Sequence, residues 1–126
     1  MSSRPESPRT RRVAERITVE LAEILATKAE DPRLRTLSVT GARVSRDLSS
    51  ARIWVSGAVP APEEPAILKA LAHATPYLRT LLAPRLGLRI VPTLQFAMDH
   101  STESGARIEK LLQEIRKPDL REPESE

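Results

Sequence analysis

A proline in the middle of a long segment with helical periodicity is the feature that most constrains how this chain can fold. Pro76 has no backbone N–H to donate, and its ring disfavours helical geometry in the residue before it. Thr75 is also a favourable N-cap residue, so the pair can end one helix and begin the next. We therefore predict two consecutive helices, over residues 65–74 and from Pro76 to about Gly87, that meet at a sharp kink. Their apolar faces comprise Ile67, Leu68 and Leu71 in the first helix and Tyr77, Leu78, Leu81 and Leu82 in the second.

The N-terminal part of the chain predicts a long amphipathic helix. Ser7, a cap residue followed by Pro8, marks where this helix begins, and Pro32 requires it to stop by Asp31. Charged side chains fill one face, and the apolar face comprises Val13, Ile17, Leu21, Ile24 and Leu25.

Between residues 36 and 56 the chain becomes rich in β-branched residues, which predicts two antiparallel strands joined by a turn at residues 46–50. Strict alternation would put Val39 and Val44 on opposite faces, so we expect a β-bulge near Gly41-Ala42 that returns Val44 to the core. In the second strand the alternation places Ile53 and Val55 inward and Trp54 on the outer face.

Residues 91–98 alternate cleanly and predict a third strand, with Leu94, Phe96 and Met98 inward. Ser101 is expected to cap a last helix, whose apolar stripe comprises Ile108, Leu111, Leu112 and Ile115. The predicted order is α-β-β-α-kink-α-β-α. We therefore expect an α+β domain in which helices cover one face of a three-stranded sheet.

The length and the two ends of the chain define one folded domain. A chain of 126 residues can bury one modest core but not two. Proline, serine and charged residues dominate both ends, so we expect a disordered basic segment at residues 1–6, a disordered acidic tail at residues 118–126 and a folded domain at residues 7–117. No apolar stretch follows the N-terminus and cysteine is absent, so we expect a soluble, cytoplasmic protein without disulfides.

Arginine dominates the basic residues of this chain. Only four of the 20 basic residues are lysine, and the net charge is +3. A planar guanidinium matches phosphate oxygens, which favours a nucleic acid or another acidic partner. Codon usage in a G+C-rich genome could produce the same excess, so the charge alone does not choose between these interpretations.

Four segments, in this order and spacing, resemble the family of ribosome-binding factor A. They are Asp31-Pro32-Arg33-Leu34, the turn Val44-Ser45-Arg46-Asp47-Leu48-Ser49, the segment at residues 88–96, and Gly105-Ala106-Arg107-Ile108-Glu109-Lys110-Leu111-Leu112. The resemblance implies a type II KH-like fold and a factor that binds the 16S rRNA of the immature 30S ribosomal subunit and assists its late processing. In this family an interhelical Ala-x-Gly kink replaces the GxxG loop of KH domains. Ala74-Thr75-Pro76 stands at that position here, and its proline supplies the bend but removes a backbone donor.

Three groups of residues are candidates for contact with RNA. Basic side chains at the first turns of a helix oppose its dipole, which hints at an external anion there. Trp54 could stack on a base or be covered by a neighbour, but a chain with 2% aromatic residues cannot rely mainly on stacking. The candidates are Arg9, Arg11, Arg12 and Arg16 at the first helix, Arg43, Arg46 and Arg52 around the hairpin, and His73, Thr75 and Arg79 around the kink.

The remaining polar residues do not predict catalysis. Asp99, His100 and Ser101 are adjacent in sequence, and such side chains diverge at the end of a strand instead of converging as a hydrolase triad does. No carboxylate cluster accompanies the two histidines, so we expect no metal, no cofactor and no enzymatic activity. Our leading hypothesis is a monomeric assembly factor that binds the small ribosomal subunit and no membrane. The alternative is a protein-interaction adapter that makes no direct contact with RNA.

Overall fold

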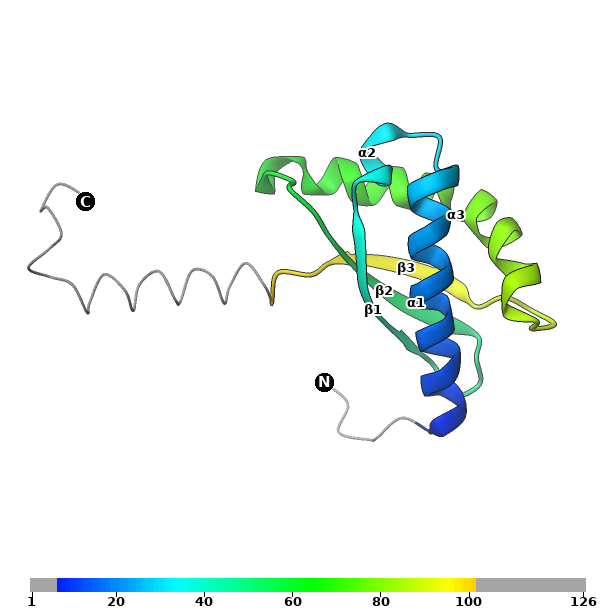
Figure 1. Ribbon diagram of the computed structural model, residues 1–126. Coiled ribbons are helices and arrows are strands. Elements are labelled where there is room, and N and C mark those ends of the chain that lie inside the picture. The colour runs from blue at the N-terminus through cyan, green and yellow to red at the C-terminus, as the bar shows by residue number, and fades with distance from the viewer. Residues whose placement is uncertain (1–6, 102–126) are drawn as a thin grey trace, which may run out of the picture.

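Three strands form a mixed sheet in the order β1-β2-β3 in the computed structural model, which describes residues 7–101 (Figure 1). β1 (Ser38–Val44) and β2 (Ser50–Ser56) are antiparallel, as the sequence predicts, and β3 (Thr93–Met98) lies parallel to β2 on its other side. A parallel neighbour requires a crossover, and the long helix between β2 and β3 supplies it. The predicted α+β class with a three-stranded sheet is confirmed.

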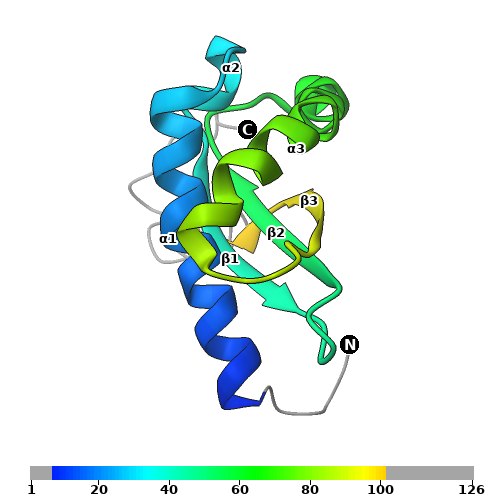
Figure 2. The ribbon, with the colours of Figure 1, turned by 90° about the vertical axis from the view of Figure 1, so that its right-hand side faces the viewer.

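Two long helices cover one face of this sheet (Figures 1 and 2). α1 spans Pro8–Lys28 and α3 spans Glu64–Leu86. Ser7 caps α1 as predicted, because its hydroxyl oxygen accepts the backbone N–H of Thr10 at 3.2 Å. The core between these helices and the sheet is formed by fully buried aliphatic side chains, among them Ile17, Leu21, Ile24, Leu25, Ile53, Val55, Leu71, Leu78 and Leu82.

Two short elements escaped the sequence analysis. α2 spans Pro32–Arg35, and Asp31 is its N-cap, whose carboxylate accepts the N–H of Arg33 at 3.0 Å. A 3-10 turn spans Ala61–Glu63. α2 repeats the signal that begins α1, a cap residue followed by proline. The sequence interpretation used Pro32 only as the end of the previous helix.

The kink is present, but the prediction of two separate helices is wrong. α3 is continuous from Glu64 to Leu86 with Pro76 inside it, and both views show it changing direction near its middle (Figures 1 and 2). Thr75 is not an N-cap, because its hydroxyl donates to the carbonyl of Leu71 at 2.8 Å, one turn back in the same helix. Tyr77, predicted to be buried, is 43% exposed. The helix ends as predicted at Gly87, whose φ of 68° is the left-handed C-cap conformation.

The predicted bulge lies one residue earlier than expected. The register of β1 against β2 shifts between Val39 and Gly41, so the extra residue is Thr40. As a result Val44 is buried, while Gly41 and Arg43 face outward opposite Trp54 and Arg52. Within the described residues no helix is long and apolar enough to cross a membrane. The expected last helix and the two expected tails lie outside residues 7–101.

Candidate nucleic-acid interface

Arginine side chains gather at one end of the domain, which we call the basic end. Three elements meet there: the first turns of α1, the β1–β2 hairpin, and the loop that leads from α3 into β3 (Figures 1 and 2). The hairpin and the loop are joined by a hydrogen bond from the N–H of Thr93 to the carbonyl of Ser49 at 2.9 Å. The arginines of the basic end are Arg9, Arg11, Arg12, Arg16, Arg46, Arg85 and Arg89, and Arg43 and Arg52 lie on the adjoining outer face of the sheet. Sequence analysis missed Arg85 and Arg89, although Arg89 lies in the segment at residues 88–96 that carried the resemblance.

The start of α1 presents four exposed arginines and no acidic residue in its first turn. This arrangement is unfavourable for the helix dipole, so it gives α1 no stability that would explain the charges. Arg16 is partly neutralised by Glu20, at 3.4 Å from its Nε. The candidates Arg9, Arg11 and Arg12 keep their charge directed outward from an exposed helix surface.

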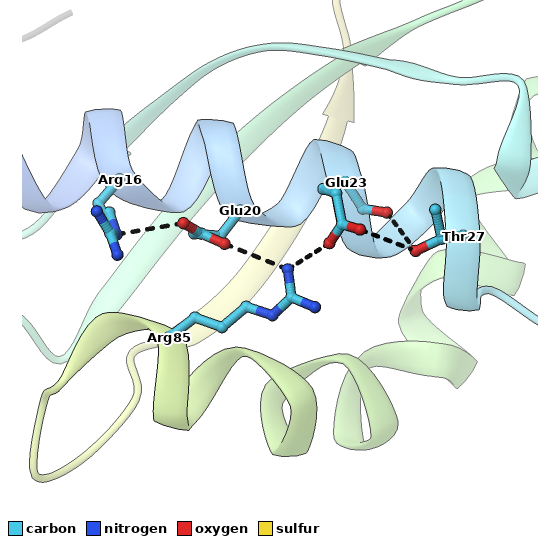
Figure 3. Close-up of polar contacts among 5 residues, drawn as sticks. All are labelled: Arg16, Glu20, Glu23, Thr27 and Arg85. Atoms are coloured by element: carbon cyan, nitrogen blue, oxygen red, sulfur yellow. Dashed lines mark hydrogen bonds and ion pairs between the residues drawn. The ribbon is translucent and has the colours of Figure 1, made fainter.

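Arg85 has a different role, because it braces α3 against α1 (Figure 3). Its Nη1 lies 3.2 Å from a carboxylate oxygen of Glu20 and also bonds to Glu23. The hydrogen bond from Arg85 lowers the pKa of Glu23, and the same bond raises the pKa of Arg85. The charge of Arg85 is therefore largely neutralised by the two carboxylates of α1.

The turn of the hairpin is held by its own side chains and presents Arg46 on its surface. The Asp47 carboxylate accepts hydrogen bonds from the Ser49 hydroxyl at 2.7 Å, the Ser45 hydroxyl at 2.8 Å and the Ser49 N–H at 3.1 Å. These bonds, led by those from the Ser49 and Ser45 side chains, lower the pKa of Asp47 to about 2. Leu48 adopts a left-handed φ of 62° within this turn. A turn ordered in this way presents Arg46 to a ligand without further ordering of the turn backbone.

The outer face of the sheet carries the other two hairpin candidates. Arg43 and Arg52 are cross-strand partners, and Gln95 of β3 is the neighbour of Arg52 on the other side. Together with Trp54 they line an open groove of about 790 Å³. The structure therefore brings Arg43, Arg52 and Trp54 together, as a single surface next to Arg46.

The three candidates near the kink do not form a comparable cluster. The Arg79 guanidinium donates to the backbone carbonyls of Val91 at 2.6 Å and Pro92 at 3.2 Å, so it fastens the segment before β3 to α3. Thr75 is bonded within its own helix. His73 is exposed on another side, where it lines a groove of about 660 Å³ beside Tyr77. RNA contact by these residues stays a prediction.

The hydrogen bonds at the end of β3 do not form a nucleophilic relay through Asp99, His100 and Ser101. The Ser101 hydroxyl donates directly to Asp99 at 2.7 Å, whereas His100 lies 3.3 Å from Glu64 at the start of α3. The Thr40 hydroxyl, followed by Ser101, lowers the pKa of Asp99 to about 2. Asp99 thus ties the bulge residue of β1 to the end of β3. Among residues 7–101 there is also no group of three His, Asp or Glu side chains that could hold a metal ion.

Comparisons with known proteins agree with this architecture. The family profile of ribosome-binding factor A matches residues 9–112. The factor from Staphylococcus carnosus is 39% identical over 111 residues, which cover 88% of this chain and 96% of the relative. The factor from Alkalilimnicola ehrlichii is 42% identical over 108 residues, with 85% and 83% covered.

Solved structures show the same fold. The crystal structure of ribosome-binding factor A from Thermus thermophilus has a TM-score of 0.62 and 31% identity, covering 71% of this chain and 94% of that one. A Thermus thermophilus homology model fitted into the cryo-electron microscopy map of a 30S complex has a TM-score of 0.59 and 32% identity, with 70% and 92% covered. The expected type II KH-like fold is therefore confirmed, and this chain belongs to the ribosome-binding factor A family.

Proposed function

We propose that this protein is an assembly factor that binds the 16S rRNA of the immature 30S subunit and assists its late processing. It acts in the cytoplasm as a monomer, and its mechanism is binding rather than catalysis. Support comes from its family and from the Thermus thermophilus relative that was fitted into a map of a 30S complex. The observation that carries the proposal is the basic end, to which three different elements contribute exposed arginines: Arg12 of α1, Arg46 of the hairpin and Arg89 of the loop before β3.

The physical basis of binding is the neutralisation of RNA phosphates. Each phosphate contact releases condensed counterions, so the affinity falls with salt at a logarithmic slope of about −0.7 per contact on single strands and about −0.9 on duplex DNA. Arginine suits this task because its fork can contact two phosphate oxygens. A factor held in this way stabilises one local conformation of the rRNA and leaves once that conformation no longer presents the same phosphates.

The test is co-sedimentation with immature 30S subunits over a salt series. We expect the double variant Arg12→Glu with Arg46→Glu to lose at least tenfold in affinity and to show a shallower salt slope. A matched control, Lys28→Glu with Lys69→Glu, makes the same change in net charge away from the basic end and should bind normally. Equal losses in both variants would show that only net charge matters, and no loss in either would exclude the basic end as the interface.

One surface favours the alternative of a protein-interaction adapter. The groove beside His73 lies between α2 and the first half of α3, and it is lined by Ala66, Ala70, Ala74 and the exposed ring of Tyr77. A groove that combines apolar side chains with charges of both signs, among them Asp31 and Lys69, suits a protein partner better than phosphates. Ribonuclease treatment of a lysate distinguishes the two functions, because it should abolish particle association under our proposal and leave it intact for an adapter.

A further inference from the structure

The outer face of the sheet holds a set of side chains that the fold itself does not need. α1 and α3 both pack on the opposite face, so within residues 7–101 no helix covers this one (Figure 2). Outward positions of such a sheet are ordinarily polar and tolerant of substitution. Here they include the single tryptophan of the chain and two arginines placed side by side.

The groove on this face carries positive charge. Arg43 and Arg52 are directly opposite on adjacent strands, where a pair of like charges contributes no stability to a sheet. No Asp or Glu occurs among the described residues that line the groove. The charge of this surface is therefore complementary to a phosphate, which Arg52 can contact through its fork.

Trp54 is half-buried, and its two cross-strand neighbours are small. Its partner on β1 is Gly41 and its partner on β3 is Ala97, the two smallest residue types. A Cβ built on Gly41 meets no atom within 4 Å, so there is open space above Gly41, the residue of β1 that pairs with Trp54. Gly41 does not have a positive φ, so backbone conformation does not explain why glycine occupies this position.

We propose that this face binds single-stranded RNA, with one base stacked on Trp54 and an adjacent phosphate on Arg52. The two residues are two positions apart on β2 and face the same way, which separates them by about 7 Å, a distance that one nucleotide spans. Stacking requires an unpaired base, so a duplex cannot use this surface. Gln95, beside Arg52, offers an amide that can donate to or accept from the sugar or the base edge. The inference rests on the proposed function and adds the kind of RNA and the residues that hold it.

Trp54 supplies its own assay, because it is the only tryptophan in the chain. Titration of the full-length protein with a short oligouridylate should quench the tryptophan emission to saturation. An RNA duplex with the same number of phosphates should bind the basic end, as measured by anisotropy of a labelled duplex, and leave the emission unchanged. Quenching by both RNAs alike would overturn the stacking arrangement.

Three variants separate stacking from misfolding, with affinity measured by anisotropy of the labelled oligouridylate. Trp54→Ala should bind about tenfold to a hundredfold more weakly, whereas Trp54→Phe should stay within a few-fold of the original because a phenyl ring still stacks. Gly41→Val fills the open space above Gly41, opposite Trp54, and favours the strand, so it should keep or raise the Tm while losing at least tenfold in affinity. Ser38→Val adds a similar side chain at the far end of β1 and should change neither property. A Gly41→Val variant that binds normally would refute the proposal.

The test of RNA binding on the outer face of the sheet and the test of the basic end can fail separately. If the emission does not respond to RNA while Arg12→Glu with Arg46→Glu still abolishes subunit binding, the sheet proposal fails and the proposed function stands. If that double variant binds subunits normally, the proposed function fails. The alternative to be excluded is that an acidic segment, residues 118–126 of this chain, binds this groove in place of RNA. A change in Trp54 emission without RNA in the triple variant E122Q/E124Q/E126Q would assign the face to them and overturn the RNA assignment.

Discussion

Replacing Arg79 by alanine should destabilise the protein strongly, although the sequence alone placed this residue among the RNA contacts. Its guanidinium donates two hydrogen bonds to backbone carbonyls of the segment that precedes β3, at 2.6 Å to Val91 and 3.2 Å to Pro92. Both acceptor residues are buried, so their carbonyls would lose a partner in an environment where water is scarce.

The magnitude follows from the two bonds. A hydrogen bond to a charged group contributes about 1.5–3 kcal/mol, and the partial exposure of Arg79 places each bond toward the lower end of that range. We therefore expect Arg79→Ala to lower the free energy of unfolding by about 3–4 kcal/mol. At roughly 4–8 °C per kcal/mol for a small domain, the Tm should fall by about 10–30 °C. Arg79→Lys keeps a charge that can reach one carbonyl and should lose about half as much.

The assay is urea unfolding followed by circular dichroism, with Arg89→Ala as the control. Arg89 is an exposed arginine of the same loop, so its loss should change stability by no more than about 0.5 kcal/mol. RNA affinity is then measured at a temperature where Arg79→Ala is fully folded, and it should equal that of the original protein. Unchanged stability together with weakened RNA binding in Arg79→Ala would refute the reasoning and make Arg79 a direct RNA contact.

Three further changes test local features of the fold by the free energy of unfolding in urea. Ser7→Ala removes the acceptor for the N–H of Thr10 and should lower the free energy of unfolding by about 1 kcal/mol. Ser38→Ala, at a serine that caps no helix, is the control, and an equal loss in both variants would contradict the capping role. Gly87→Ala should lower the free energy of unfolding by about 1 kcal/mol, because Gly87 has a φ of 68°. Gly41→Ala should leave that free energy unchanged or raise it, and a larger loss at Gly41 than at Gly87 would be inconsistent with the backbone geometry. Asp99 has a pKa of about 2 when folded, below its ordinary value of 3.8, so its stabilisation is complete above about pH 4 and is lost as the pH falls toward 2. Asp99→Asn should flatten that part of the pH profile of stability, and an unchanged profile would exclude its bonds to Thr40 and Ser101 as the cause.

Local signals in the sequence predicted the elements that depend on neighbouring residues. Ser7 and Pro8 define the start of α1, and the broken alternation between Val39 and Val44 indicates a bulge, because caps and strand registers are set within a few residues. The same local logic failed at Thr75-Pro76. Leu71 and Leu78 are both fully buried, and the packing of one continuous face outweighs the hydrogen bond that Pro76 removes, so the helix bends instead of ending.

The sequence also predicted only those features of the candidate site that depend on neighbouring residues. Arg43 and Arg52 could be placed together from the hairpin register, since pairing across a turn is a local property. The partners of Arg79 are 12 and 13 residues away, and they become visible only when α3 packs beside the start of β3. Nothing in the spacing of residues distinguishes an arginine that will meet a backbone carbonyl from one that will remain in solvent.

The arginines of this chain fall into two groups with different physical roles. Arg33, Arg35, Arg79 and Arg85 all bond to groups of the protein itself: Asp31, the carbonyl of Ala29, the segment before β3, and the α1 carboxylates. For Arg33, Arg79 and Arg85 the fork geometry matters, since one guanidinium holds two acceptor atoms. Carboxylates compensate the charges of Arg33 and Arg85, whereas Arg35 and Arg79 bond to neutral carbonyls. For Arg12, Arg46 and Arg89 the charge itself matters, because long-range attraction to phosphates depends on the sum of unscreened charges rather than on any single contact. The arginines of this chain therefore divide into a structural set, whose side chains are held by other groups of the protein, and an interaction set that includes Arg52 and whose side chains RNA phosphates can reach.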